Sequence, residues 1–214
     1  MMDVVGQIEE AHRELGNTGK GRSVLIRRDY DATVEDVWDA CTTADRIGRW
    51  LGPVTGDLRL DGHYQLEGNA GGTILRCEPP RLLRVTWVYG ENPGTNTSEV
   101  EVRLSPAADG KTTFELEHGP VDLDPEFWAR FGPGATGLGW DLSLLGLAAL
   151  LSGEDVDVDA HEELLKTPEA VEFLRRSGRA WQAAHEASGA TAEAAAGAAE
   201  RTIAAYTEPP PSGN

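Results

Sequence analysis

The sequence predicts an α+β fold in which a curved antiparallel sheet wraps around one long helix. Between residues 54 and 118, apolar and polar side chains alternate with a period of two, and glycine or proline separates the runs. This alternation is typical of antiparallel strands with one buried and one solvated face. Residues 135–151 then form a helical segment that is apolar on nearly every side. Such a helix must be covered, and the sheet is the element large enough to cover it.

The first 20 residues are expected to form a separate N-terminal helix. Its apolar side chains share one stripe, with charged residues opposite, and the Gly-Asn-Thr-Gly sequence at 16–19 is expected to end it. The stripe consists of Val4, Val5, Ile8 and Leu15.

The main domain, residues 21–153, is expected to begin with a strand over 23–30 and a helix that Thr33 caps, with Asp36 three residues on. The apolar residues of this helix recur on one face: Val34, Val37, Trp38 and Cys41. A second short helix over 44–51 leads into a meander of six strands. Residues 119–134 are expected to form a loop before the long helix.

Residues 154–214 are expected to form a C-terminal helical extension after an acidic linker at 156–159. Thr167 followed by Pro168 starts one helix, and Thr191 starts a second. These helices are expected to pack against the core; the alternatives are that they cover the mouth of a cavity or meet a second copy, which would give a homodimer.

Composition excludes several classes of function. The chain has 36 acidic and 19 basic residues, a net charge of −17, which argues against nucleic acid and anionic lipid as partners. Neither a signal peptide nor an apolar run of about 20 residues is present, so we expect a cytoplasmic protein that does not cross a membrane. Cys41 and Cys77 lie in apolar patterns and are expected to be reduced thiols.

The sequence patterns that could indicate a cofactor or metal site do not fit such sites. Residues 132–137 fit G-x-G-x-x-G, but no strand precedes them, and small residues that let the long helix settle on the sheet explain them better. The five histidines never occur at i and i+4. We therefore expect no cofactor and no metal, and we assign no catalytic residue.

Several separated segments resemble one known family. The sequence Arg-Arg-Asp-Tyr-Asp-Ala-Thr-Val-Glu-Asp-Val-Trp at 27–38, Trp50, Gly-Asp-Leu-Arg-Leu at 56–60 and Gly-Trp-Asp at 139–141 resemble the START-like (SRPBCC) superfamily. Within it, the branch of heat-shock protein 90 ATPase activator homologues is the most similar. The resemblance covers about residues 21–152 and implies a helix-grip fold. It leaves function open, because members include lipid carriers, aromatic polyketide cyclases, hormone receptors and co-chaperone domains.

A sheet that grips a helix encloses a cavity suited to an apolar ligand. Strand parity places one set of side chains inward, and two tryptophans are expected at the cavity mouth. The inward residues are Tyr64, Trp87, Phe114, Leu116 and His118, and the mouth residues are Trp50 and Trp140. The alternative is that these aromatic residues fill the core and that His118 is a buried histidine with its hydrogen bonds satisfied. Arg76 and Arg84 are expected to face solvent.

Asp141 interrupts the apolar helix and has two interpretations. The preferred one places it in the first helical turn, where the helix dipole favours a carboxylate. The other has it face the cavity as a general acid or base.

Three functions compete. The leading hypothesis is a non-catalytic protein that binds a small apolar or aromatic molecule, with Trp50, Tyr64, Trp87, Phe114, His118, Trp140 and Asp141 as ligand-binding residues. The second is an interaction protein that docks on a chaperone, and the third is a cyclase-like enzyme that uses Asp141 or His118.

Overall fold

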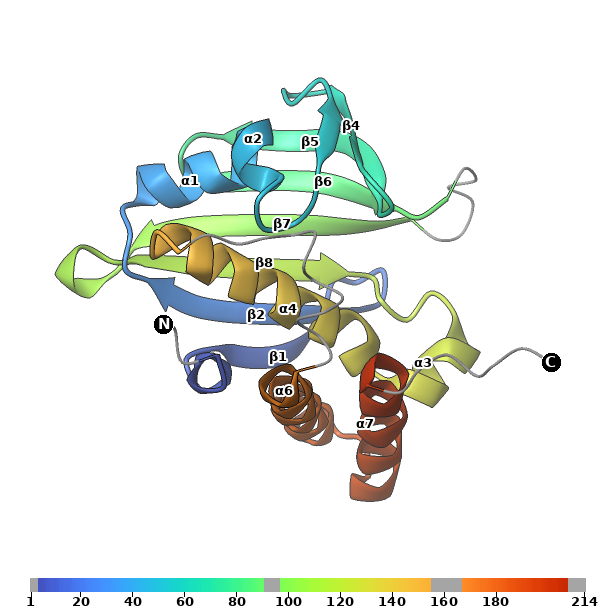
Figure 1. The fold of residues 1–214 in the computed structure, drawn as a ribbon. Helices are drawn as coiled ribbons and strands as arrows, with labels where there is room; N and C mark the ends of the chain where they lie inside the picture. The colour runs from blue at the N-terminus through green and yellow to red at the C-terminus, as the bar shows by residue number, and fades with distance from the viewer. Residues whose placement is uncertain (1–3, 91–96, 155–166, 208–214) are drawn as a thin grey trace.

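The computed structural model describes residues 4–90, 97–154 and 167–207. Its centre is an eight-stranded antiparallel sheet in the order β1-β2-β8-β7-β6-β5-β4-β3. The strands are β1 (His12–Asn17), β2 (Arg22–Tyr30), β3 (Val54–Gly56), β4 (His63–Leu66), β5 (Gly71–Glu78), β6 (Leu82–Val88), β7 (Thr97–Pro106) and β8 (Thr112–Gly119). The sheet curves around α4 (Gly134–Leu151), which lies across its inner face (Figure 1). The predicted helix-grip architecture is confirmed.

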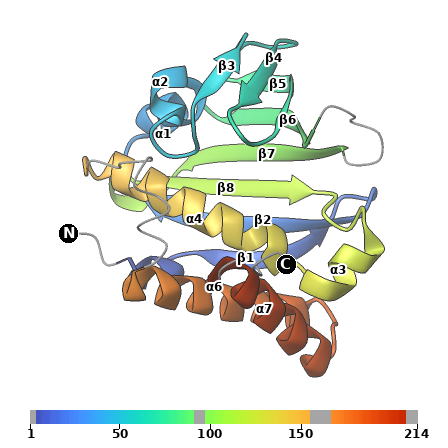
Figure 2. The same cartoon turned by 45° about the vertical axis from the view of Figure 1, so that its right-hand side comes forward.

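Five further α-helices are described. They are α1 (Val34–Thr42), α2 (Ala44–Ile47), α3 (Pro125–Phe131), α6 (Pro168–Ala187) and α7 (Ala192–Thr207), with short 3-10 turns at Gly6–Ile8 and Ala108–Gly110. The predicted start of α1 is confirmed, because the Thr33 hydroxyl accepts a hydrogen bond from the Asp36 backbone N–H at 3.2 Å. Helices α1 and α2 connect β2 to β3 and cover one end of the sheet (Figure 2).

The core lies between the inner face of the sheet and α4. Its fully buried side chains include Val24, Ile26, Phe114, Leu116, Leu138, Leu144 and Leu147. Among the described helices, α4 is the one whose length and composition would let it cross a membrane, but 61% of it is buried inside the protein. Its apolar composition is therefore that of a core helix, enclosed by the sheet on one side and by α6 on the other.

The N-terminal helix predicted for residues 1–20 is wrong. His12–Asn17 form β1, an edge strand that pairs antiparallel with β2, so this segment belongs to the sheet. Gly16 and Asn17 are the last residues of β1, and residues 18–21 form the turn to β2, where the Thr18 N–H donates to the Gly21 carbonyl at 3.0 Å. Pairing with a neighbouring strand outweighed a local pattern that fits an amphipathic helix.

The loop predicted for residues 119–134 contains a helix, α3. Asp124 caps it, since its Oδ1 accepts from the backbone N–H groups of Glu126 and Phe127, both at 3.0 Å. Pro125 occupies the first helical position, as prolines commonly do.

The two predicted C-terminal helices are confirmed as α6 and α7. Thr167 caps α6 through the Ala170 N–H at 3.2 Å, and the Thr191 hydroxyl accepts from the Ala194 N–H at 3.2 Å. Helix α6 packs on α4 and β1, and α7 packs on α6 and α3 (Figures 1 and 2). The expected packing of these helices against the core is confirmed. The acidic linker at 156–159 lies outside the described residues.

The glycines at the start of α4 serve close packing, but against a different partner from the one expected. A Cβ at Gly137 would overlap the indole ring of Trp181 on α6, and one at Gly134 would lie 3.3 Å from Thr202 on α7. These glycines therefore bring the C-terminal helices onto α4. The expectation that they let α4 approach the sheet is wrong.

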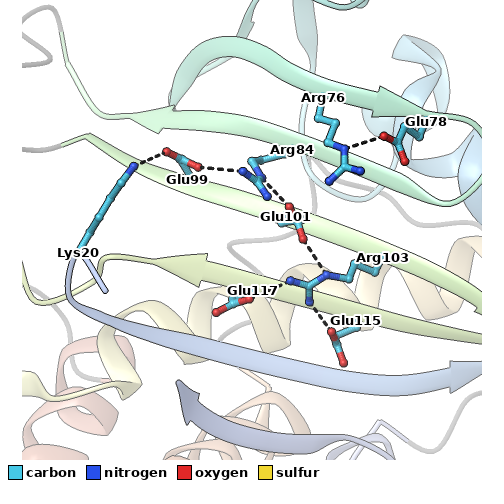
Figure 3. Close-up of polar contacts among 9 residues, drawn as sticks. All are labelled: Lys20, Arg76, Glu78, Arg84, Glu99, Glu101, Arg103, Glu115 and Glu117. Atoms are coloured by element: carbon cyan, nitrogen blue, oxygen red, sulfur yellow. Dashed lines mark hydrogen bonds and ion pairs between the residues drawn. The ribbon is translucent and has the colours of Figure 1, made fainter. Parts of the chain in front are cut away.

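The outer face of the sheet is covered by ion pairs instead of by a helix (Figure 3). Arg84 pairs with Glu101 at 2.5 Å, Arg103 also pairs with Glu101 at 2.7 Å, and Lys20 pairs with Glu99 at 3.1 Å. Arg84 faces outward, as strand parity predicted. Because these charges neutralise one another at a solvated surface, they keep this face soluble and contribute little stability individually.

Candidate functional site

A cavity of about 100 Å³ lies between the sheet, α4 and the α1–α2 segment. Apolar side chains line nearly all of it, and both cysteines, Cys41 and Cys77, reach its wall as free thiols. Trp50 and Tyr64, two of the predicted residues, also line it. Their polar atoms are satisfied elsewhere: Trp50 Nε1 donates to the Ala40 carbonyl at 2.9 Å, and the Tyr64 hydroxyl donates to the Thr86 carbonyl at 2.7 Å. The cavity is therefore an apolar space.

A larger groove of about 500 Å³ adjoins this cavity. Leu51, Trp87 and Trp140 line both spaces, so the cavity and the groove meet at these three side chains. The far side of the groove is built by the segment before α3, by α3 itself and by Tyr206 near the end of α7. The C-terminal extension thus contributes a side chain to the groove.

Trp87 and Trp140, where the cavity and the groove meet, form a cluster of rings with His118. Trp87 and Trp140 lie with their ring centroids 5.1 Å apart, and His118 lies 5.9 Å from Trp87 and 6.0 Å from Trp140. The three come from β6, α4 and β8. Strand parity predicted that Trp87 and His118 face inward, and the structure brings both against Trp140.

His118 takes part in a complete chain of hydrogen bonds. Trp140 Nε1 donates to its Nδ1 at 3.0 Å, so the proton of the neutral ring lies on Nε2, which donates to Ser98 Oγ at 2.7 Å. Ser98 Oγ in turn donates to the Trp87 carbonyl at 3.1 Å. Burial lowers the pKa of His118 to about 3, so the ring is neutral at physiological pH. His118 is therefore a buried histidine with both nitrogens bonded.

Trp87 stands apart from the other tryptophans of the site. It is 5% exposed, and its Nε1 has no hydrogen-bond partner among the described residues. A buried N–H without an acceptor costs about 1–3 kcal/mol relative to one that is bonded. Trp87 therefore places a buried hydrogen-bond donor between cavity and groove that none of the described residues satisfies.

Phe114 and Asp141, the remaining predicted residues, line neither space. Phe114 is fully buried in the core, edge-on to Tyr30 with centroids 5.7 Å apart. Asp141 lies about two turns after the start of α4 at Gly134, so the interpretation that the helix dipole favours it in the first turn is wrong.

Asp141 instead fastens three elements together. Arg13 of β1 donates to its carboxylate from Nε at 3.0 Å and from Nη2 at 3.0 Å. From α6, Ser177 Oγ donates at 2.5 Å and Trp181 Nε1 at 3.0 Å. The side chains of Arg13 and Asp141 are 5% and 3% exposed. The carboxylate is thus used in binding the extension to the core.

Tyr206, the groove and the partners of Asp141 were not predicted from the sequence. The sequence does contain a signal for the partners of Asp141, because a carboxylate inside an apolar helix needs a buried partner. Ser177 and Trp181 lie at i and i+4 on one face of α6, which indicates a shared neighbour.

No group of three or more histidine, cysteine, aspartate or glutamate side chains in residues 4–90, 97–154 and 167–207 is arranged to hold a metal ion.

Solved structures of two proteins are informative. The crystal structure of CalU16 from Micromonospora echinospora is 38% identical, with 82% of this chain and 96% of that chain covered and a TM-score of 0.62. Its solution NMR structure is 36% identical, with 83% and 96% covered and a TM-score of 0.67. The Aha1 dimer from Colwellia psychrerythraea, 16% identical over 60% of this chain and 95% of that chain, has a TM-score of 0.50 and shares the fold.

Comparison with curated proteins gives no match. The family model described as "Activator of Hsp90 ATPase homolog 1-like protein" matches residues 31–152, more than half of the chain. This match agrees with the resemblance in sequence and with the helix-grip architecture. The chain belongs to the family of activator of Hsp90 ATPase homolog 1-like proteins.

Proposed function

We propose that the protein binds a small aromatic molecule that carries a hydrogen-bond acceptor, without catalysing its conversion. The observation that carries this proposal is the apolar cavity of about 100 Å³, which is lined by Trp87, whose buried Nε1 has no partner among the described residues. The cavity supplies the apolar environment, and the indole N–H supplies one directional contact.

The size of the cavity sets the size of the ligand's apolar part. An apolar cavity of about 150 Å³ in a protein core takes up benzene. The cavity here is smaller, about 100 Å³, so it holds no more than a single ring, and a longer ligand has to continue past Trp87 and Trp140 into the groove.

The hydrogen-bond donor sets the polarity of the ligand. An ether, carbonyl or hydroxyl oxygen next to Trp87 Nε1 would satisfy a buried N–H for which the described part of the chain supplies no acceptor. A net gain of about 0.5–1.5 kcal/mol is typical for such a bond, which corresponds to roughly two- to tenfold in affinity.

The competing hypotheses have less support. An enzyme was expected to use Asp141 or His118, but the Asp141 carboxylate is bonded to Arg13, Ser177 and Trp181, and His118 is neutral with both nitrogens bonded. Docking on a chaperone is suggested by the family's description, and none of the contacts described above favours it.

Anisole and ethylbenzene test the proposal, because they have nearly the same shape and differ in one acceptor oxygen. We expect anisole to saturate the protein in an NMR titration and to bind roughly two- to tenfold more tightly than ethylbenzene. Val85→Phe should abolish binding, because Val85 lines the cavity and a larger side chain fills it.

Val88→Phe is the matched control. Val88 lies on the same strand with the opposite parity and does not line the cavity, so this variant should bind anisole as the wild type does. The proposal fails if wild-type protein shows no saturable binding, or if Val85→Phe binds anisole unchanged.

A further inference from the structure

The groove beside the cavity has an unusual combination of walls. Five aromatic rings face it, and two of them are substantially exposed: Tyr89 at 58% and Phe127 at 49%. The rings belong to Trp87, Tyr89, Phe127, Trp140 and Tyr206. Aromatic faces that remain open to a groove can contact a ligand there without any rearrangement of the core.

The charge in the groove is negative. Asp124 is its one carboxylate, and no lysine or arginine lines it among the described residues. His118, the remaining titratable nitrogen base in its wall, is buried and bonded on both ring nitrogens, so it adds no positive charge. Aromatic rings with a carboxylate and no competing cation are the chemistry that recognises an organic ammonium group.

Asp124 has one carboxylate oxygen to spare. Its Oδ1 caps α3 through the N–H groups of Glu126 and Phe127, whereas none of the described residues donates a hydrogen bond to Oδ2. The net charge of −17 also attracts cations to the surface of the protein as a whole.

We propose that the groove binds a protonated amine, and that the ligand of this protein is an aromatic molecule with a cationic arm. The ring occupies the cavity and the arm passes Trp87 and Trp140 to lie against the groove's rings near Asp124. This inference rests on the proposed function for the position of the ring. It also gives the C-terminal extension a role, because Tyr206 of α7 forms part of the amine subsite.

Three compounds with one phenyl ring and arms of similar length separate charge from shape: 4-phenylbutylamine, 4-phenylbutanol and 4-phenylbutanoate. In NMR titrations of the whole chain at pH 7 we expect the amine to bind about tenfold more tightly than the alcohol, from cation–π and carboxylate contacts combined. The carboxylate should bind most weakly.

Two carboxylates two residues apart provide the matched variants. Asp124→Asn keeps an α3 cap, since asparagine caps helices well, and should weaken the amine about three- to tenfold while leaving the alcohol unchanged. Glu126→Gln removes the same charge from a residue that does not line the groove and should leave both affinities unchanged. Phe127→Leu, which removes an exposed ring, should weaken the amine about threefold.

The outcomes distinguish this inference from the proposed function. If the alcohol binds and Val85→Phe abolishes that binding, but the amine binds no more tightly than the alcohol, the amine subsite is refuted and the cavity proposal stands. Equal effects of Asp124→Asn and Glu126→Gln on the amine also refute the subsite. If neither anisole nor the alcohol binds, the proposed function fails, and the inference built on it fails too.

Discussion

Two consecutive residues of α4, Trp140 and Asp141, have opposite kinds of surroundings. Trp140 borders a cavity of about 100 Å³ and a groove of about 500 Å³, next to Trp87, whose buried Nε1 has no partner among the residues that the structure describes. Asp141 accepts hydrogen bonds from Arg13, Ser177 and Trp181, and the void beside it is about 10 Å³, at the limit of one water molecule. One side of the helix leaves room for a ligand, and the other side is closed by contacts that hold the extension in place.

This contrast explains why an unusually apolar helix contains an aspartate. The extension needs a fixed position if Tyr206 is to reach the groove. The buried Asp141 carboxylate, paired with Arg13 of β1 and hydrogen-bonded to Ser177 and Trp181 of α6, specifies such a position. On the side of Trp140, the buried Nε1 of Trp87 has no acceptor among the described residues. On the side of Asp141, the carboxylate and its donors satisfy one another.

The largest expected effect on stability comes from removing the Asp141 carboxylate. Asp141→Ala leaves Arg13 buried without its carboxylate, and loss of one partner of a buried pair typically costs about 3–5 kcal/mol. Urea denaturation followed by circular dichroism measures this loss in the free energy of unfolding. The double variant with Arg13→Met should recover part of it, because no uncompensated charge remains. A loss below about 1 kcal/mol for Asp141→Ala would show that the Asp141 carboxylate does not hold these elements together.

A smaller effect is expected from the helix contact next to this pair. Gly137→Ala places a methyl group where the Trp181 ring lies, and overpacking of this kind costs about 1–3 kcal/mol. Gly139→Ala is the control on the same helix, since its Cβ would meet the Tyr206 hydroxyl at 3.3 Å, a group that can shift. The same denaturation measurement should rank Gly139→Ala above Gly137→Ala in stability, and equal stabilities would contradict the packing argument.

The neutral, buried state of His118 beside the groove can be tested by measuring how the stability of the protein depends on pH. The pKa of His118 is lowered to about 3 in the folded protein, below the ordinary value of 6.5, so between these values the unfolded chain binds a proton that the folded chain does not. The contribution of His118 to the free energy of unfolding is therefore fully present above pH 6.5 and decreases as the pH falls toward 3.

Compared with His118→Gln, wild-type protein should lose about 1.4 kcal/mol more per pH unit between pH 6 and 4. Denaturation midpoints of both proteins at several pH values supply the comparison. Parallel pH profiles would show that the His118 ring does not stay neutral in the folded state.

Local patterns predicted the architecture well and the long-range contacts poorly. Alternation of apolar residues placed Trp87 and His118 on the inner face, and the apolar composition of 135–151 identified the helix that the sheet surrounds. The segment at 12–17 misled, because its spacing fits a helix as well as an edge strand and its pairing with β2 is not visible locally.

The partners of Asp141 lie 128 and 36–40 residues away in sequence, so local patterns indicate that Asp141 needs a buried partner and that Ser177 and Trp181 share a neighbour, but they do not join the two. The cavity could not be predicted for a different reason. Parity tells which side chains face inward, but whether they fill the space depends on the packing of every neighbour, and here Phe114 fills the core while Trp87 borders a void.

The most direct measurement is the signal of the Trp87 indole N–H in a ¹⁵N–¹H NMR spectrum of the labelled protein during titration with anisole. Trp181, which lines neither the cavity nor the groove and already donates to Asp141, serves as the internal reference. We expect the Trp87 proton to resonate upfield in the free protein and to move downfield as the ligand oxygen accepts its hydrogen bond, while the Trp181 signal stays unchanged. Saturation by anisole without movement of the Trp87 signal would refute the proposed contact.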